Sequence, residues 1–466
     1  MAPRIVIIGG GSVQWVPKLL RDIANTPSLH GSEVVIEDID GASVPRMVGL
    51  AEHIAGIRGI PLTVTGTTDQ RVALAGADFV VVAISTGGFA SMRHDLAIPA
   101  RFGVRQTIGD TVGPGGIARA LRNIPVLVDI ARDMEALCPD AWLLNVTNPM
   151  TTLCRAITGQ SSIKAVGLCH EITITQLLLS LLLDTNYFDV DMTVAGVNHL
   201  PIITELRLAG ADGFADLTEL LGGGDLLDQP LAMELPDGVL HGAPRGDKWT
   251  KRDIVDHSQI KLDVFRRFGV LPGAGDRHVA EFFAGYLTEE SAWGEHWGVQ
   301  LVPIEVHEGS QVDHLADFAR DLASDHVSEW PSGELVAPLI DSLITGTPRV
   351  MPLNIPNDGS VADLPDGVVV EMMCVADRDG VRGRDQVSLP PFLAEHLRRI
   401  SASQEFTVQA ALSGRRSLVL DAMQTDPLAG RMDARRLDEM ADELLGATAA
   451  WLPRFASSLS DPALKG

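Results

Sequence analysis

The fold is decided by the stretch Arg4-Ile5-Val6-Ile7-Ile8-Gly9-Gly10-Gly11-Ser12. Residues 5–8 are a continuous apolar run, which is typical of a parallel strand buried on both faces. Glycines follow at once, and residues 15–23 then have the apolar spacing of a helix. A strand, a glycine-rich turn and a helix together predict a dinucleotide site, because glycines let the backbone approach a pyrophosphate at a helix N-terminus.

The glycine pattern itself is incomplete, since Gln14 stands where a third glycine is expected. A tight turn without a ligand therefore stays open as an alternative. The next predicted strand, residues 33–38, ends in Asp38, near the position of a ribose-binding carboxylate. We interpret four residues as cofactor-binding: Gly9, Gly11, Ser12 and Asp38.

Two further strands are predicted at residues 77–84 and 141–149, and a helix at 117–137 separates them. Alternating strands and helices predict a Rossmann-type, doubly wound α/β sheet. Ligands of such sheets bind beyond the carboxyl ends of the strands. Thr86, Gly87 and Asn148 follow these two strands, so we expect them beside the cofactor.

A cysteine and a histidine follow two later strand-like runs. Cys169 ends the run Val166-Gly167-Leu168, and His199 ends the run Ala195-Gly196-Val197-Asn198. A thiolate and a neutral imidazole from two strand ends could hold a divalent metal together. Taken alone, Cys169 would more often be a small buried apolar residue.

Composition limits the class of protein. The chain has 466 residues, enough for about two to three domains of roughly 150 residues. Its net charge of -24 argues against nucleic acid and an anionic membrane as partners. Four scattered cysteines, no signal-peptide pattern and no apolar run of about 18 residues predict a cytoplasmic protein.

We expect a dinucleotide-binding domain over residues 1–195 and a C-terminal α+β domain over 196–466 that completes the substrate and metal site. Strands are predicted in this second half at 350–356 and 368–372, and helices at 253–268, 392–400, 406–412 and 437–450. A glycine-rich loop after the first of these helices carries Asp276, Arg277 and His278. We assign His278 to stabilising that loop or a subunit contact.

Seven motifs in order identify a family that the chain resembles. They are Gly9-Gly10-Gly11-Ser12, Gly113-Pro114-Gly115-Gly116, Asn145-Val146-Thr147-Asn148-Pro149, Gly167-Leu168-Cys169-His170-Glu171, Gly196-Val197-Asn198-His199, Gly275-Asp276-Arg277-His278 and Asn354-Ile355-Pro356-Asn357-Asp358-Gly359. They resemble glycoside hydrolase family 4, the NAD- and metal-dependent glycosidases related in fold to malate and lactate dehydrogenases. This family is an exception to hydrolysis by two carboxylates.

The resemblance implies redox-assisted elimination. NAD takes hydride from C3 of the sugar, and the new ketone acidifies the proton on C2. A base removes that proton, the glycosidic oxygen leaves C1, water adds, and hydride returns to C3. A metal cation stabilises the negative charge that develops at the C2–C3 oxygens. Mn²⁺ is the metal that the family implies.

The resemblance also implies roles for individual residues. Cys169 and His199 match metal ligands, and Asn148 matches a contact to the sugar hydroxyls. Asp276 matches the C2 base, and Arg277 beside it is expected to keep it ionised. His170 and Glu171 are candidates for the acid that protonates the leaving oxygen. Arg277, Arg93 and Asn198 are further candidate substrate contacts.

The triplet Cys169-His170-Glu171 resembles the branch of the family that acts on unphosphorylated α-glycosides. Glu171 favours an α-glucoside, with α-galactosides and α-uronides as further possibilities. Arg93 and Arg105 fit an anionic sugar, because arginine favours bidentate contacts to carboxylates. By analogy with the family we expect a homodimer or homotetramer.

Two other classes of function stay open. A dehydrogenase of the 2-hydroxy-acid type would share the fold and turn over NADH, but it would not need Cys169 as a metal ligand. A non-enzymatic NAD-binding sensor would have no reason to keep Cys169, His199 and Asp276 together. The presence of these three residues counts against the sensor.

Overall fold

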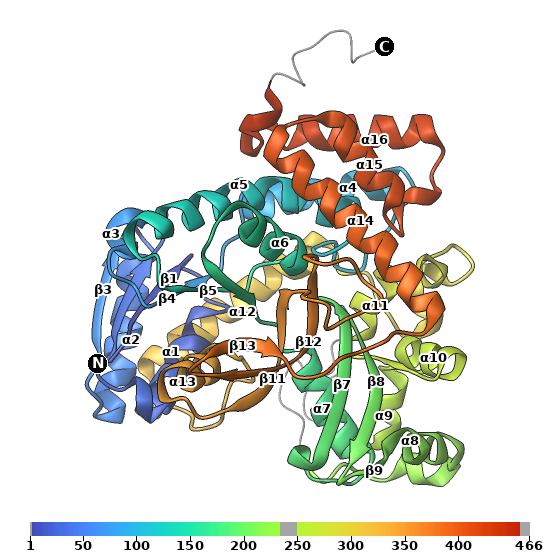
Figure 1. Ribbon diagram of the computed structural model, residues 1–466, viewed down its shortest axis with the longest axis horizontal. Coiled ribbons are helices and arrows are strands. Elements are labelled where there is room, and N and C mark those ends of the chain that lie inside the picture. Colours follow the sequence, from blue (N-terminus) through green and yellow to red (C-terminus); the bar gives the residue numbers. More distant parts are fainter. Residues whose placement is uncertain (1, 234–248, 457–466) are drawn as a thin grey trace.

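The computed structural model describes residues 2–233 and 249–456, and its centre is one 13-stranded sheet (Figure 1). Six strands of this sheet run parallel in the spatial order β3-β2-β1-β4-β5-β6. Dinucleotide-binding sheets have this order, with the ligand crevice where the strand order reverses, between β1 and β4. The strands are β1 (Arg4–Ile8), β2 (Glu33–Glu37), β3 (Thr63–Thr67), β4 (Phe79–Val82), β5 (Trp142–Asn145) and β6 (Lys164–Gly167).

Antiparallel strands continue the same sheet beyond β6, in the order β11-β12-β7-β8-β10. Strands β9 and β13 pair with β8 and β12. The expected boundary between residues 195 and 196 falls inside β7, so strands of both halves share one sheet. The strands are β7 (Val190–Val197), β8 (Leu200–Leu208), β9 (Ala211–Asp212), β10 (Leu271–Pro272), β11 (Arg349–Pro356), β12 (Val369–Asp377) and β13 (Gly380–Gly383).

Helices cover both faces of the parallel strands because alternate residues of each strand point to opposite faces. Ile5 and Ile7 join a core with α1 (Val16–Asn25), α2 (Val44–Arg58) and α13 (Val336–Thr345). Val6 and Ile8 join a second core on the other face (Figure 1). That core includes α3 (Gln70–Leu74), α4 (Gly88–Arg101), α5 (Gly113–Leu137), α6 (Met150–Gln160), α15 (Arg416–Thr425) and α16 (Ala434–Ala447).

The other helices surround the antiparallel strands or connect the two halves. They are α7 (Glu171–Leu182), α8 (Gly213–Gly222), α9 (Lys251–Asp256), α10 (Gln259–Phe268), α11 (Asp276–Phe282), α12 (Ile304–Ala323) and α14 (Pro391–Ser413). The long α14 has its first half in one core and its second half in the other.

The sequence prediction was wrong about several helix boundaries. Residues 392–400 and 406–412 belong to the single helix α14, because no glycine or proline interrupts the chain between them. The expected helix 253–268 is broken at His257 and Ser258 into α9 and α10. The loop Gly113-Pro114-Gly115-Gly116 is the first turn of α5, and its proline at the second helical position suits a helix start.

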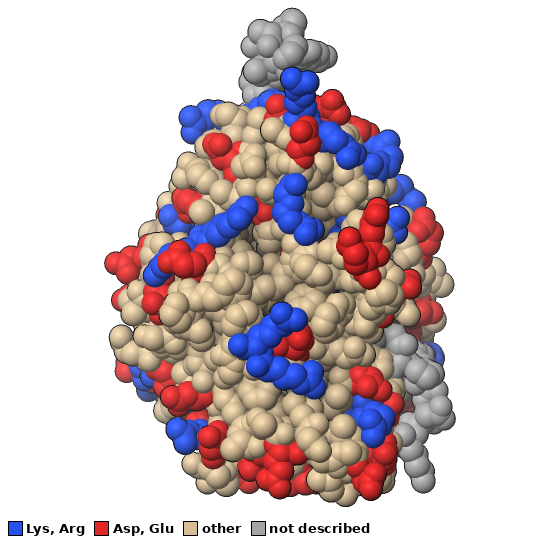
Figure 2. Space-filling model, turned by 90° about the vertical axis from the view of Figure 1, so that its right-hand side faces the viewer, with Lys and Arg blue, Asp and Glu red and all other residues tan. Residues whose placement is uncertain are grey.

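The surface carries charges of both signs. Figure 2 shows the side where α8 and α10 lie, and there basic and acidic side chains are interspersed among uncharged ones. No helix among the described residues has the length and apolarity that crossing a bilayer requires.

Candidate active site

The turn after β1 has the geometry that only glycines allow. Gly9 has φ +79°, and a Cβ there would overlap the carbonyl oxygen of Ala83. A Cβ at Gly11 would overlap the side chains of Ser43 and Asp38. The Gly11 N–H donates to Asp38 Oδ2 over 2.8 Å, and Ser12 Oγ accepts from the Trp15 N–H over 3.3 Å. The turn therefore brings bare backbone and the acid at the end of β2 to one place, which fits a dinucleotide.

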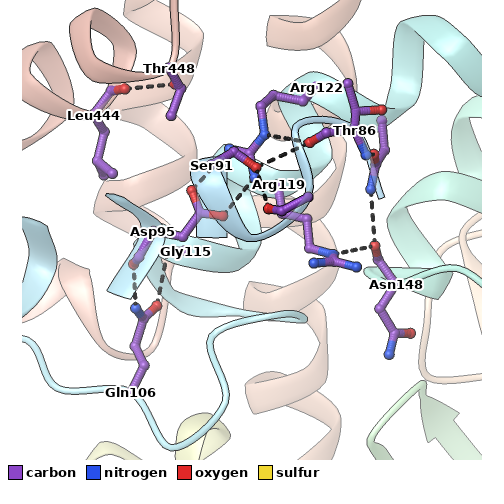
Figure 3. Close-up of polar contacts among 12 residues, drawn as sticks. Thr86, Ser91, Asp95, Gln106, Gly115, Arg119, Arg122, Asn148, Leu444 and Thr448 are labelled. Carbon is purple, nitrogen blue, oxygen red and sulfur yellow. Dashed lines mark hydrogen bonds and ion pairs between the residues drawn. The ribbon is translucent and has the colours of Figure 1, made fainter. Parts of the chain in front are cut away.

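Buried polar groups fix the second loop beside this crevice, after β4 (Figure 3). The Thr86 N–H donates to Asn123 Oδ1 over 3.0 Å, and the Thr86 carbonyl accepts from Arg122 Nε over 3.3 Å. Gly87 has φ +83° and precedes the first residue of α4. The position of Thr86 thus depends on side chains of α5.

Arg122 itself is held by a buried ion pair (Figure 3). Its two Nη atoms donate to the two carboxylate oxygens of Asp95 over 2.9 and 2.6 Å. Arg122 is 2% exposed and Asp95 is 0% exposed. A bidentate pair of this kind fixes α4 and α5 relative to each other, and with them the loop of Thr86.

Three ionisable side chains form a compact group at the edge where the parallel strands end. Their potential ligand atoms, from Asp110, His199 and His278, all lie within 4.8 Å of one another. The rings of the two histidines are 3.6 Å apart between centroids. The Thr111 hydroxyl lies 2.7 Å from His199 Nδ1, and Asp110 Oδ1 lies 3.9 Å from the same nitrogen.

Electrostatics keep this group in the protonation state that metal binding requires. Burial lowers the pKa of His199, although Asp110 and Glu171 oppose that shift. Burial and the neighbouring His199 lower the pKa of His278. Burial opposes the charge of Asp110, but His199, His278 and Arg119 outweigh it and lower the pKa of that carboxyl. Two neutral imidazoles beside a carboxylate are ready-made metal ligands.

Cys169 lies outside the compact group of three but contacts its neighbours. The thiol interacts with the Asn198 side chain and with the backbone N–H of Glu171. Burial, followed by the charges of Glu371 and Glu171, raises the pKa of this thiol well above its ordinary value. A cation would be needed to hold the thiolate form there, because the surroundings disfavour a bare negative charge.

The two candidate acids differ in protonation. His170 Nδ1 lies 3.4 Å from Glu334 Oε1, and its ring faces Trp15 with 6.1 Å between centroids. Burial opposes the charge, but Glu334 and Glu171 raise the pKa of His170. Burial also opposes the charge of Glu171, yet its histidine neighbours lower the pKa of that carboxyl. His170 therefore suits proton donation better than the ionised Glu171.

Asn148 connects the dinucleotide crevice with the compact group. Its Nδ2 donates to Asp110 Oδ2 over 3.1 Å. Figure 3 shows its backbone carbonyl, which accepts from Arg119 Nε over 3.0 Å. Its buried Oδ1 has no hydrogen-bond partner among the described residues. A buried amide oxygen without a partner fits a contact to a sugar hydroxyl or a metal-bound group.

Asp276 is the first residue of α11, and both of its carboxylate oxygens face the start of α10. They accept from the backbone N–H groups of Ile260 and Lys261 over 2.7 and 3.0 Å. Burial raises the pKa of Asp276 to about 6, and the Lys261 ammonium is the main opposing charge. The expectation that Arg277 keeps Asp276 ionised is thus wrong, because the neighbouring cation is that of Lys261.

Arg277 instead faces the acids of the site. Its electrostatic partners are Glu171, Asp110 and Glu281, and burial lowers its pKa. Its buried Nε has no hydrogen-bond partner among the described residues. Arg277 lines a cavity of about 270 Å³ with Glu171, Asp276 and His278, so its guanidinium is placed to contact a ligand.

Arg93 is not among the residues that line this cavity. Its guanidinium is half-exposed and pairs with Glu305 and Glu308 of α12 over 3.3 and 2.6 Å. Arg105 packs over the ring of Trp293. Both arginines therefore already contact side chains of other surface segments: Arg93 contacts α12, and Arg105 contacts Trp293.

The buried carboxyl of Glu281, which contacts the loop before Asp110, predicts that the stability of the protein depends on pH. Its Oε1 accepts from the N–H groups of Ile108 and Gly109, both over 2.8 Å, and burial raises its pKa from 4.5 to about 7. Because the pKa of Glu281 is higher in the folded state, its full contribution to the free energy of unfolding is present below pH 4.5. That contribution is lost as the pH rises through 7. The loss is on the order of 3 kcal/mol.

We expect Glu281→Gln to remove this pH dependence. Between pH 5 and 8, wild type should lose stability relative to the variant, as followed by urea unfolding at several pH values. Parallel stability curves for the two proteins would contradict the assignment.

The sequence reading underrated three residues of the site: Asp110, His278 and Arg119. The motif Gly109-Asp110-Thr111 offered a signal, because an acid in a glycine-rich loop is unusual. The sequence predicts that His278 stabilises its loop or a subunit contact, and the structure places its ring against that of His199. Nothing in the sequence placed Arg119, because it lies inside the regular helix α5.

Comparison with known proteins decides the family. Residues 4–184 match the model of the family 4 glycosyl hydrolases, and residues 194–429 match the model of their C-terminal domain. The chain belongs to glycosyl hydrolase family 4. Together the two matched regions contain Gly9, Cys169, His199 and Asp276.

Relatives of this family 4 member cover more than nine tenths of its length. It is 32% identical to an α-galacturonidase of Thermoanaerobacterium saccharolyticum, over 93% of each chain. It is 29% identical to an α-galactosidase of Bacillus subtilis, over 97% of this chain and 99% of the relative. The crystal structure of lplD from Bacillus subtilis superposes with a TM-score of 0.84 at 27% identity, over 96% and 100% of the chains.

Proposed function

We propose that this family 4 member hydrolyses unphosphorylated α-glycosides with the help of NAD and a divalent metal. One observation carries the proposal: Asp110, His199 and His278 converge at the carboxyl edge of a dinucleotide-binding sheet. Cys169 reaches the same region through Asn198 and Glu171. This arrangement supports a site in which a metal and NAD would act on the same sugar.

The residues fit both groups. The turn at Gly9 and Gly11, with Asp38 at its side, suits NAD, and the loop at Thr86 and Gly87 borders the same crevice. Cys169 and His199 would hold the metal, as the family resemblance implies, and Asp110 and His278 are further candidate ligands because their potential ligand atoms lie within 4.8 Å of those of His199. Nitrogen, oxygen and sulfur donors are acceptable to Mn²⁺ and to other borderline metals. When bound, NAD supplies reversible hydride removal at C3 of the sugar, and the metal supplies positive charge beside the reacting oxygens.

The remaining side chains would orient the sugar and move its protons. Asn148 and Arg277 offer buried polar atoms that have no hydrogen-bond partner in the described part of the chain, which suits sugar hydroxyls or a carboxylate. Asn198 lies between Cys169 and His199 and is a candidate contact. Asp276 would remove the C2 proton, since its pKa of about 6 suits a base near neutral pH. His170 would donate a proton to the leaving oxygen.

Among the possible sugars, we place α-galacturonides ahead of α-glucosides and α-galactosides. The relative described above at 32% identity is an α-galacturonidase. Two acids, Glu171 and Asp276, and two cations, Arg277 and Lys261, line the cavity at Glu171. Because Lys261 lies beside Asp276, Arg277 is the cation that would contact the carboxylate of an anionic sugar.

The role of Asp276 has a direct test. Asp276→Asn keeps one oxygen, which can accept from the amide of Ile260 or of Lys261 but not from both, and it removes the base. We expect exchange of the C2 proton with solvent to slow by about 10²-fold or more. NMR measures this exchange, and an unchanged rate in a folded variant would place the base elsewhere.

The function itself is tested with nitrophenyl α-galacturonide, α-glucoside and α-galactoside in reducing buffer, with NAD and Mn²⁺ each present or omitted. We expect nitrophenol release that needs both additions and leaves no net NADH. Steady NADH production without release would support the dehydrogenase alternative. Assembly into a homodimer or homotetramer and a cytoplasmic location remain predictions.

A further inference from the structure

The turn that presents His199 has an unusual backbone conformation. Asn198 and His199 are the two residues between β7 and β8, and Val197 pairs with Leu200 across them. His199 has φ +67°, in the left-handed region where glycine or asparagine is normally found in such turns. A conformation of this kind persists at a functional site only when surrounding contacts hold it.

Glu371 of β12 supplies contacts to both residues of the turn. Its Oε2 accepts from the Asn198 side-chain amide over 3.2 Å, and the backbone N–H of His199 interacts with the same carboxylate. Glu371 is 0% exposed. It pairs across the sheet with Gly196, which has no side chain to block the path from β12 to the turn.

Two other contacts complete the support of the turn. The Asn198 N–H donates to the hydroxyl of Thr151 over 2.9 Å. The His199 ring is held from the other side by Thr111 over 2.7 Å. Among these supports, Glu371 alone reaches both residues of the turn.

We propose that Glu371 is a positioning residue that holds the Asn198–His199 turn, with His199 in its left-handed conformation, and thereby aims the imidazole of His199 at Asp110 and His278. The effect on the turn is independent of any ligand. Its consequence for metal binding rests on the proposed function.

The test compares two substitutions at Glu371. Glu371→Met keeps the length of the side chain and removes both acceptor oxygens, whereas Glu371→Gln keeps one acceptor. Hydrogen–deuterium exchange of the segment 195–200 reports the turn without metal. We expect exchange about tenfold faster or more in Glu371→Met, and within about threefold of wild type in Glu371→Gln.

Metal binding is the second measurement. Free Mn²⁺, followed by its electron paramagnetic resonance signal, should reveal a dissociation constant about 10- to 100-fold higher in Glu371→Met. The affinity for NAD should stay within about twofold of wild type. Met372→Ala is the matched control, since Met372 is equally buried on the same strand but its side chain points to the opposite face.

The outcomes separate the two proposals. If the segment 195–200 exchanges in Glu371→Met at the wild-type rate, the positioning role is overturned. It is also overturned if Glu371→Gln and Met372→Ala exchange this segment as fast as Glu371→Met does. If Glu371→Met does not fold, loss of protection in Glu371→Gln overturns it. Faster exchange in Glu371→Met alone supports the role, even if wild type binds no Mn²⁺, a result that would count only against the proposed function.

Discussion

Cys169→Ser is expected to lower metal-dependent turnover by about 10³-fold or more. The change replaces one atom and makes the side chain only slightly smaller, so the core formed by Met150, Cys154, Cys169 and Val369 should stay packed. A serine hydroxyl stays protonated where a metal-bound thiol would ionise, so it is a poor ligand. The lost stabilisation of charge is worth several kcal/mol, and each 1.4 kcal/mol is a factor of ten in rate.

The measurement is initial-rate hydrolysis over a titration of Mn²⁺, with Mn²⁺ binding followed separately. Cys154→Ser is the matched control, because Cys154 is also buried in the same cluster and burial raises its pKa to about 12 without a nearby charge. We expect near-normal metal affinity in this control. Full activity of Cys169→Ser in metal-stripped buffer would exclude Cys169 as a ligand.

Asp95→Asn is expected to lower the free energy of unfolding by about 3–5 kcal/mol. The amide cannot balance the charge of Arg122, which would remain fully buried without a counter-ion. The loop of Thr86 should also lose its fixed position, since the Thr86 carbonyl accepts from Arg122. Urea unfolding and NAD binding measure these two effects.

Two comparisons make this prediction specific. Glu308→Gln breaks the exposed pair with Arg93 and should cost about 1 kcal/mol or less. Asp95→Leu combined with Arg122→Met should recover most of the stability, because apolar residues can replace a buried ion pair. NAD affinity should remain low in that double variant, and recovery of NAD affinity would show that Arg122 does not position Thr86.

The parallel half of the fold was predictable from the sequence, because each strand there is a short apolar run that ends in glycine or a polar residue. The strand order follows from the βα units, and the family resemblance supplied the rest. The hairpin of β7 and β8 and its pairing with β12 were not predictable, because they join residues that are far apart in the chain.

The site was predictable where the chemistry is carried by motifs, as at Gly9, Cys169 and His199. It was not predictable where two side chains meet through the fold alone. Arg277 follows Asp276 in the sequence, yet Lys261 is the cation beside Asp276, because the carboxylate points to the start of α10. Glu371 gave no signal either, since it stands in an otherwise apolar strand.

The most direct measurement of the central claim is hydrolysis in D₂O, with the product analysed by NMR and NADH followed by absorbance. We predict deuterium at C2 of the released sugar, only when NAD and Mn²⁺ are both present, and no net NADH. Hydrolysis that proceeds without NAD and leaves C2 fully protonated would contradict redox-assisted elimination and indicate direct displacement at C1.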